Sequence, residues 1–119
     1  MFILDLDRGT YTRKSTVQGL FDGTPDQIER VLEGSSEFLY FTEEGGRDAG
    51  VHARNSDGNF FTVFESPVYD DETSGLSWSP DGRIMYVAYQ FTGYLYSVWR
   101  RDGEPFHQTQ LDVKFHHQP

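Results

Sequence analysis

The sequence contains a pattern of strand-forming residues that returns after about 46 positions. Phe38-Leu39-Tyr40-Phe41 and Ile84-Met85-Tyr86-Val87 lie 46 positions apart, and the Asp-Gly turns that follow them, at 57–58 and 102–103, lie 45 apart. A repeat of roughly 40 to 50 residues with about four short strands per unit is typical of β-propeller blades. The repeat therefore predicts an all-β chain built from blades of this kind.

Short runs rich in Tyr, Phe, Val, Thr and Ile support this interpretation, because Gly, Asp, Asn or Pro bounds each of them. Turns such as Pro80-Asp81-Gly82 and Arg101-Asp102-Gly103 supply the positive φ that tight hairpins require. Consecutive strands are therefore expected to pair antiparallel. The expected strands are residues 2–7, 11–17, 27–32, 38–43, 50–55, 60–65, 75–79, 84–90, 94–100 and 107–113.

Residues 24–32 also fit a short helix, in which Thr24 caps the first turn and Pro25 occupies its first position. A helix of this length is marginal in water. The repeat places a strand in the same region, and this favours the strand.

The repeat divides the chain into about two and a half four-stranded antiparallel blades. Residues 25–65 form one predicted blade and 72–113 a second, whereas 1–17 are the trailing hairpin of another blade and 114–119 are a tail. Closed propellers have roughly four to eight blades, so this partial propeller would leave sheet faces open. The expected partner is the remainder of a propeller, another protein chain or further copies of this one.

Acidic residues outnumber basic residues by 19 to 10, which gives a formal net charge of -9. A field of this sign repels phosphate backbones, so nucleic acid is not an expected partner, whereas cations are. The sequence has neither the run of roughly 18 apolar residues that a membrane helix needs nor a recognisable signal peptide. It also has no cysteine, which excludes thiolate metal sites but leaves the compartment open.

Between residues 24 and 107 the chain contains four segments in this order: TPDQI, FLYFTEEGG, DETSGLSWSPDGRIMYVAYQ and YLYSVWRRDGEPFH. Together they resemble motifs in the C-terminal blades of the PhoX-type alkaline phosphatases, a family of six-bladed propellers, over about residues 21–103. The resemblance implies a calcium-dependent phosphomonoesterase with iron also in its metal cluster, and an extracytoplasmic location. This chain would supply only the last third of such a ring, so we do not expect it to be catalytic on its own. The alternative is a non-enzymatic, propeller-derived interaction module that docks through its open blade edges in a larger complex or a homo-oligomer.

The resemblance also assigns roles to single residues. Carboxylates of the family's motifs fall on Asp26, Glu44 and Glu72, which are therefore the expected metal ligands. Phe91-Thr92-Gly93 stands where the family has a His-Pro-Gly sequence, which weakens the case for surviving phosphatase chemistry.

The residues themselves point to the same region. Glu43-Glu44 ends one predicted strand and Asp70-Asp71-Glu72 precedes another, and strand ends of this kind converge near a propeller axis. Carboxylates crowded together raise one another's pKa values or bind a hard cation, for which calcium with its oxygen ligands is the natural choice. The alternative is that both runs are ordinary solvated turns of an acidic protein.

Arg47 follows the Glu-Glu-Gly-Gly turn and is the candidate for binding an anion such as a phosphoester, with a salt bridge to Asp48 or Glu44 as the alternative. The histidines are weaker candidates for site residues. His116 and His117 would point in opposite directions in an extended tail, and His52 is expected to be a partly buried hydrogen-bonding residue. No Ser-His-Asp arrangement is legible in the sequence.

Overall fold

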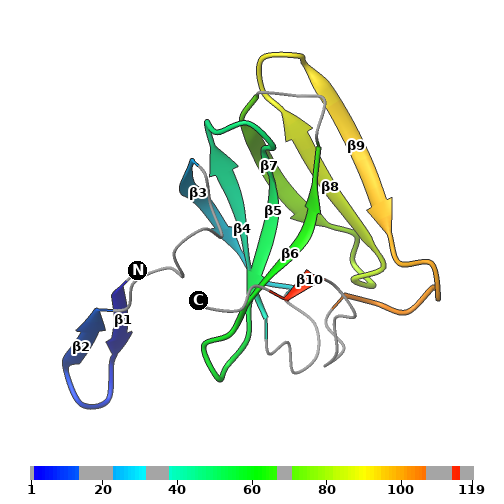
Figure 1. Ribbon diagram of the computed structural model, residues 1–119. Helices are drawn as coiled ribbons and strands as arrows, with labels where there is room; N and C mark the ends of the chain where they lie inside the picture. Colours follow the sequence, from blue (N-terminus) through cyan, green and yellow to red (C-terminus); the bar gives the residue numbers. More distant parts are fainter. Residues whose placement is uncertain (1, 14–22, 32–37, 67–70, 107–113, 116–119) are drawn as a thin grey trace.

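The computed structural model describes residues 2–13, 23–31, 38–66, 71–106 and 114–115 (Figure 1). These residues form β-strands in three antiparallel sheets and no helix, which confirms the all-β prediction, and no helix that could cross a membrane is found among them. The strands are β1 (Phe2–Asp5), β2 (Thr10–Arg13), β3 (Thr24–Glu29), β4 (Leu39–Glu44), β5 (Gly50–Arg54), β6 (Phe60–Glu65), β7 (Thr73–Trp78), β8 (Ile84–Tyr89), β9 (Tyr94–Trp99) and β10 (Lys114–Phe115).

The largest sheet has the strand order β10-β6-β5-β4-β3. Within it, β3 to β6 form a four-stranded antiparallel meander over the residues of the first predicted blade. The helical alternative for residues 24–32 is wrong for the described residues, because Ile28 pairs with Phe41 and Glu29 with Tyr40. Pairing with a neighbouring strand has outweighed a weak local preference for helix.

The second sheet has the order β7-β8-β9. The fourth strand predicted for it, at residues 107–113, lies outside the described residues. Further along the chain, β10 pairs with β6 of the first sheet, as Figure 1 shows. The predicted tail therefore contains a short strand that joins the first sheet, and the two sheets do not close a ring.

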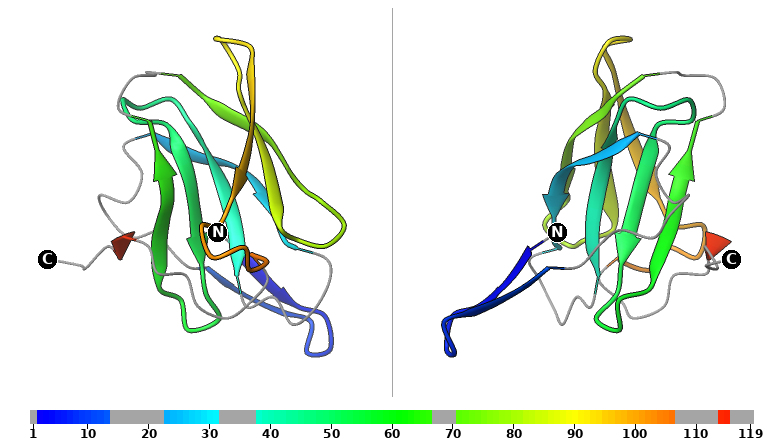
Figure 2. Two further views of the ribbon diagram at one scale, coloured as in Figure 1. Left: turned by 90° about the vertical axis from the view of Figure 1, so that its right-hand side faces the viewer. Right: turned by 60° about the vertical axis from the view of Figure 1, so that its left-hand side comes forward.

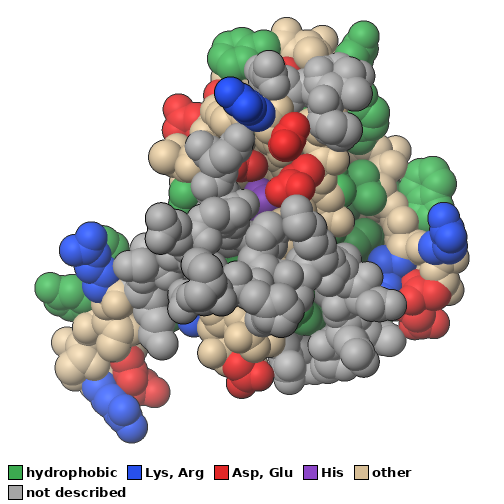
Figure 3. Space-filling model, in the orientation of Figure 1, with side chains coloured by type: hydrophobic (Ala, Val, Ile, Leu, Met, Phe, Trp, Pro, Cys, Tyr) green, Lys and Arg blue, Asp and Glu red, His purple; other side chains and the backbone are tan. Residues whose placement is uncertain are grey.

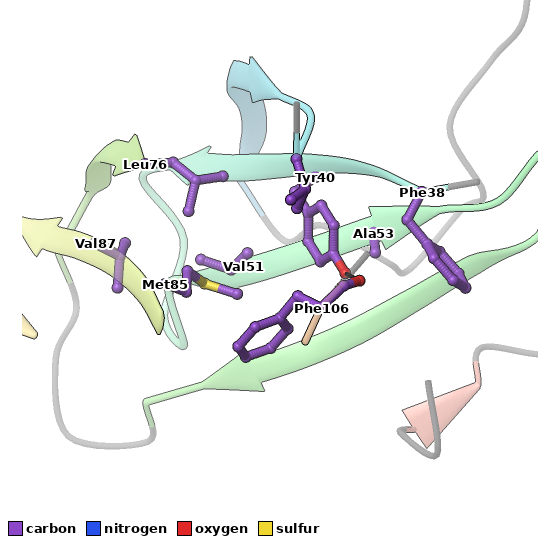
Figure 4. Packing of buried hydrophobic residues seen from close by; sticks show 9 residues of the cluster. Phe38, Tyr40, Val51, Ala53, Leu76, Met85, Val87 and Phe106 are labelled. Atoms are coloured by element: carbon purple, nitrogen blue, oxygen red, sulfur yellow. Dashed lines mark hydrogen bonds between the residues drawn. The ribbon is translucent and has the colours of Figure 1, made fainter. Parts of the chain in front are cut away.

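The two larger sheets pack face to face around one apolar core (Figure 2). The Tyr40 ring lies 4.7 Å from that of Trp78, and its hydroxyl donates to the Phe106 carbonyl oxygen at 2.9 Å. Figure 4 shows how side chains from both sheets point toward one another in this core. Its buried members are Val31, Phe38, Tyr40, Val51, Ala53, Leu76, Met85, Val87 and Phe106.

The edge strands β3 and β7 contact each other where the two sheets meet. The Gly75 N–H donates to Gln27 Oε1 at 2.9 Å, and Thr73 Oγ1 donates to the Gly50 carbonyl oxygen at 2.6 Å. Gly75 lies in a register shift between β7 and β8 with φ of 62°, a conformation that glycine adopts without strain. The first strand of each sheet is thus held at a shared junction.

The β1–β2 hairpin projects away from this two-sheet body (Figures 1 and 2). Its apolar side chains are exposed, Leu6 to 84%. The hairpin predicted over residues 1–17 is present in the described residues 2–13, and its assignment to a further propeller blade stays a prediction.

Candidate functional site

The three carboxylates predicted as metal ligands lie at one end of the junction between the two sheets. Asp26 belongs to β3, Glu44 ends β4, and Glu72 directly precedes β7. Desolvation raises the pKa of Glu72, and the negative charges of Glu44, Asp26 and Asp71 raise it further. The folded chain therefore brings negative charges together from three separate segments. Several acidic side chains gather at the same upper end of the molecule in Figure 3.

Two of these carboxylates accept long hydrogen bonds. Thr24 Oγ1 donates to Glu44 Oε2 at 3.4 Å, and Gln90 Nε2 donates to Glu72 Oε2 at 3.3 Å. Among the described residues, no three His, Asp or Glu side chains are already placed to coordinate one ion. Coordination would require rotation of the glutamate side chains, for which Glu44 is free because it is exposed. An all-carboxylate set of oxygen donors fits a hard cation such as calcium.

Asp71 has a structural role beside this cluster. Its carboxylate accepts the backbone N–H groups of Glu72 at 2.6 Å, Thr92 at 2.9 Å and Phe91 at 3.0 Å. Burial acts to raise the pKa of Asp71, but these hydrogen bonds outweigh it and hold that pKa below its ordinary value. Asp71 thus joins the start of β7 to the β8–β9 turn, and this fixes the backbone of Glu72.

Glu43 does not belong to the acidic cluster, because successive side chains of a strand point to opposite faces. Glu43 Oε2 lies 3.1 Å from His52 Nε2, and His52 Nδ1 lies 3.2 Å from Thr62 Oγ1. The Gly23 N–H donates to Glu43 Oε1 at 2.9 Å. A side chain at position 23 would place a Cβ atom 2.2 Å from the Glu44 carbonyl oxygen, so this close approach requires glycine.

The order of hydroxyl, imidazole and carboxylate in this group resembles that of an activated nucleophile. The exposed fractions of Glu43, His52 and Thr62 are only 1%, 0% and 4%, so a substrate has no access to the hydroxyl. The group is a buried polar link across β4, β5 and β6. The hydrogen-bonding role expected for His52 is confirmed, although the side chain is fully rather than partly buried and its two partners were missed. Strand alternation combined with the hairpin registers was the signal that could have found them.

Arg47 lies in the exposed loop between β4 and β5, close in sequence to Glu44. Its predicted role in binding an anion stays a prediction. Residues 107, 116 and 117, which carry the other predicted histidine candidates, and Asp70 lie outside the described residues.

A cleft of about 360 Å³ lies at the opposite end of the junction, where β3 and β7 end. The predicted metal ligands do not line it. Its described lining residues are Glu29, Arg30, Val31, Ser77, Trp78, Ser79 and Pro80.

No protein family matches this sequence, and neither a curated protein nor a solved structure is significantly similar to it. The resemblance to PhoX-type phosphatases therefore stays a prediction from short motifs. The candidate site rests on the geometry of the acidic cluster.

Proposed function

We propose that this chain is a propeller-type β segment that binds calcium through Asp26, Glu44 and Glu72 at the junction of its two main sheets. The observation that supports the proposal most directly is the convergence of acidic side chains from β3, from the end of β4 and from the segment before β7, where desolvation and then the charges of Glu44 and Asp26 raise the pKa of Glu72. Like charges held this close to one another repel, and a divalent cation with oxygen ligands removes the repulsion.

The segments that carry the ligands are held relative to one another before any ion binds. The backbone N–H of Glu43 donates to Thr73 Oγ1 at 2.9 Å, which connects the end of β4 to the start of β7. Asp71 fixes the backbone on the other side of Glu72. Preorganisation of this kind lowers the entropy that the site would lose on binding.

The propeller part of the proposal rests on the sequence repeat and on the arrangement of the first strands. The repeated segments occupy equivalent positions in the two sheets, since Phe38–Phe41 leads into and forms β4 and Ile84–Val87 begins β8. The strands β3 and β7, which precede them, contact each other at the junction. Neighbouring propeller blades meet in the same way around the central channel.

The PhoX-type resemblance extends the proposal to phosphomonoester hydrolysis by a completed ring, in which a bound cation would polarise a phosphoryl oxygen. Only the sequence motifs support this extension, and the same is true of iron. We therefore assign calcium binding to this chain and any hydrolysis to the larger assembly.

Calcium titration followed by thermal unfolding tests the proposal. A site filled to a hundred times its dissociation constant stabilises the folded state by about 2.7 kcal/mol, so the melting temperature should rise with calcium concentration. Glu44→Gln and Glu72→Gln should each reduce that rise, because each removes one charged ligand.

Asp57→Asn is the matched control, because Asp57 is an exposed acid in the β5–β6 turn, away from the predicted ligands. It removes the same charge and should keep the full response to calcium. The proposal fails if calcium leaves the melting temperature unchanged, or if Asp57→Asn lowers the response as much as Glu44→Gln and Glu72→Gln do.

A further inference from the structure

The cleft at the far end of the junction from the acidic cluster lies between two sheet edges. β3 is the last strand of the first sheet and β7 the first strand of the second, so each has one side without a neighbour in its own sheet. Gln27 and Gly75 are hydrogen-bonded at the junction, and Val31 and Pro80, further along the chain from each, both line the cleft. The two edges therefore run in the same direction into the cleft.

Trp78 presents main-chain groups on the open side of β7. The Ser79 N–H donates to the Ile84 carbonyl oxygen at 2.8 Å, and Trp78 pairs with Met85 as the next position of the ladder. Hydrogen-bonded and non-hydrogen-bonded positions alternate along an antiparallel pair, so the N–H and C=O of Trp78 point away from β8. Neither group has a partner among the described residues. A donor and an acceptor on an open strand edge are available to an extended peptide.

The Trp78 side chain adds an unpaired donor at the same place. Its indole nitrogen is buried and has no hydrogen-bond partner, although Trp78 lines the cleft. A buried donor without an acceptor is rare in native structures and unfavourable. A small rotation of the half-buried ring would bring this N–H to an acceptor seated in the cleft. The cleft volume of about 360 Å³ suits a small ligand, since such sites measure roughly 300–1,000 Å³.

Arg30 brings a positive charge to the rim of the cleft. Its side chain is exposed and forms no ion pair with the described part of the chain. Glu29, the other charged lining residue, is half-buried, and its Oε1 accepts the Arg30 N–H at 3.1 Å. A guanidinium binds a carboxylate through two parallel hydrogen bonds. A ligand carboxylate therefore suits Arg30 and the indole N–H, whereas a ligand amide suits the main chain of Trp78.

We propose that this cleft binds the C-terminal end of an extended peptide, with the terminal carboxylate at Arg30 and the last amide on the main chain of Trp78. A peptide C-terminus carries an amide and a carboxylate next to each other, which is the combination that these residues can bind. The predicted calcium ligands do not line the cleft, so peptide binding does not depend on calcium. The cleft also persists in a completed ring, because β3 and β7 stay neighbours there.

Titration of the full chain with N-acetyl-trialanine tests the proposal, because the contacts involve only the main chain and the carboxylate of the peptide. The sequence has two tryptophans, and Trp99 is 68% exposed, so Trp99→Phe leaves Trp78 as the single fluorescent reporter. The free acid should change the Trp78 emission saturably. Its C-terminal amide should bind about tenfold more weakly or worse, because it lacks the charge that pairs with Arg30.

Arg30→Gln in the same background should weaken the free acid by about tenfold and leave the amide nearly unaffected, since the two changes remove the same interaction. Glu29→Gln should not weaken the free acid, because it removes a negative charge from the cleft. Arg13→Gln is the matched control, since Arg13 is exposed on the projecting hairpin. It should leave binding unchanged, and circular dichroism should show the same fold for all variants.

Three results would overturn the proposal: no saturable change at millimolar peptide, equal binding of the free acid and the amide, or equal losses from Arg30→Gln and Arg13→Gln. Binding should be the same in calcium-free buffer and in Glu72→Gln. Failure of the peptide site and failure of the calcium site are therefore distinguishable.

Discussion

Asp71 and Glu72 are adjacent in the chain, yet their pKa values are displaced in opposite directions. Three backbone N–H groups bind the charged form of Asp71, whereas desolvation and the carboxylates of three neighbours disfavour the charged form of Glu72. The alternation of β4 separates Glu43 from Glu44 in the same way, since one is buried beside His52 and the other is exposed. From sequence position alone, Asp71 and Glu72 would be given the same role, and so would Glu43 and Glu44.

The opposite shifts predict opposite effects of neutral substitutions in calcium-free buffer. Because the pKa of Glu72 is raised on folding, its favourable contribution is complete below the ordinary pKa of 4.5 and is lost as the pH rises through the folded value. Glu72→Gln should therefore slightly raise the melting temperature at pH 7, and this gain should disappear near pH 4. Thermal unfolding followed by circular dichroism between these pH values measures both.

Asp71→Asn is the counterpart, with the opposite sign. The pKa of Asp71 is lowered on folding, so its contribution is present above the ordinary value of 3.8 and is lost as the pH falls through the folded value. The variant should be less stable than the wild type at pH 7, and the difference should shrink below about pH 4. A stabilising effect of Asp71→Asn at pH 7, or a destabilising effect of Glu72→Gln there, would contradict the assigned environments.

Among the strands, the link between Glu43, His52 and Thr62 joins the three central members of the first sheet. Both ring nitrogens of His52 have a partner on a neighbouring strand, so the imidazole satisfies a buried carboxylate and a buried hydroxyl at once. A buried network of this kind stabilises one strand register over others, because a slip of one residue would separate every partner.

Removal of the imidazole should therefore be costly. His52→Leu leaves Glu43 as a buried carboxylate without its neighbour, and we expect a loss of about 3–5 kcal/mol in the free energy of unfolding. Urea denaturation measures the loss. The double variant Glu43→Leu/His52→Leu should lose less than the sum of the two single variants, since it leaves no unpaired charge. Additive losses would show that the two side chains are not coupled.

For the whole molecule, the two-sheet body and the β1–β2 hairpin make unequal contributions. The buried apolar cluster draws its members from the body, whereas the described side chains of the hairpin are exposed except for the half-buried Asp5. Phe2 and Tyr11 contact each other, with ring centroids 5.9 Å apart. The hairpin therefore adds little to the stability of the body.

A chain that lacks residues 1–13 should consequently keep its fold. We expect its melting temperature to stay within about 2 °C of the full-length value, because the deleted side chains lose little buried area. Calorimetry of the two proteins provides the comparison. A fall of roughly 10 °C would mean that the hairpin packs against the body.

The sequence by itself determined the all-β class, the antiparallel pairing of consecutive strands and the positions of most strands. These depend on local chemistry: alternating apolar residues, aromatic and β-branched side chains, and glycines in the turns. The strand ends by themselves pointed to Glu43-Glu44 and Asp70-Asp71-Glu72, whereas the set of Asp26, Glu44 and Glu72 came from the PhoX-type resemblance and stays a prediction. The helical alternative for residues 24–32 stayed open because nine residues carry too little local preference to decide between helix and strand.

Only the tertiary structure decided which acidic side chains are exposed and which already have hydrogen-bonding partners. Asp71 accepts hydrogen bonds from N–H groups of a turn about 20 residues away, and Glu43 lies beside the His52 imidazole on the next strand. The return of β10 to β6 was likewise not predicted from the sequence. Contacts between distant segments depend on how whole sheets pack, and no short-range pattern along the chain encodes that packing.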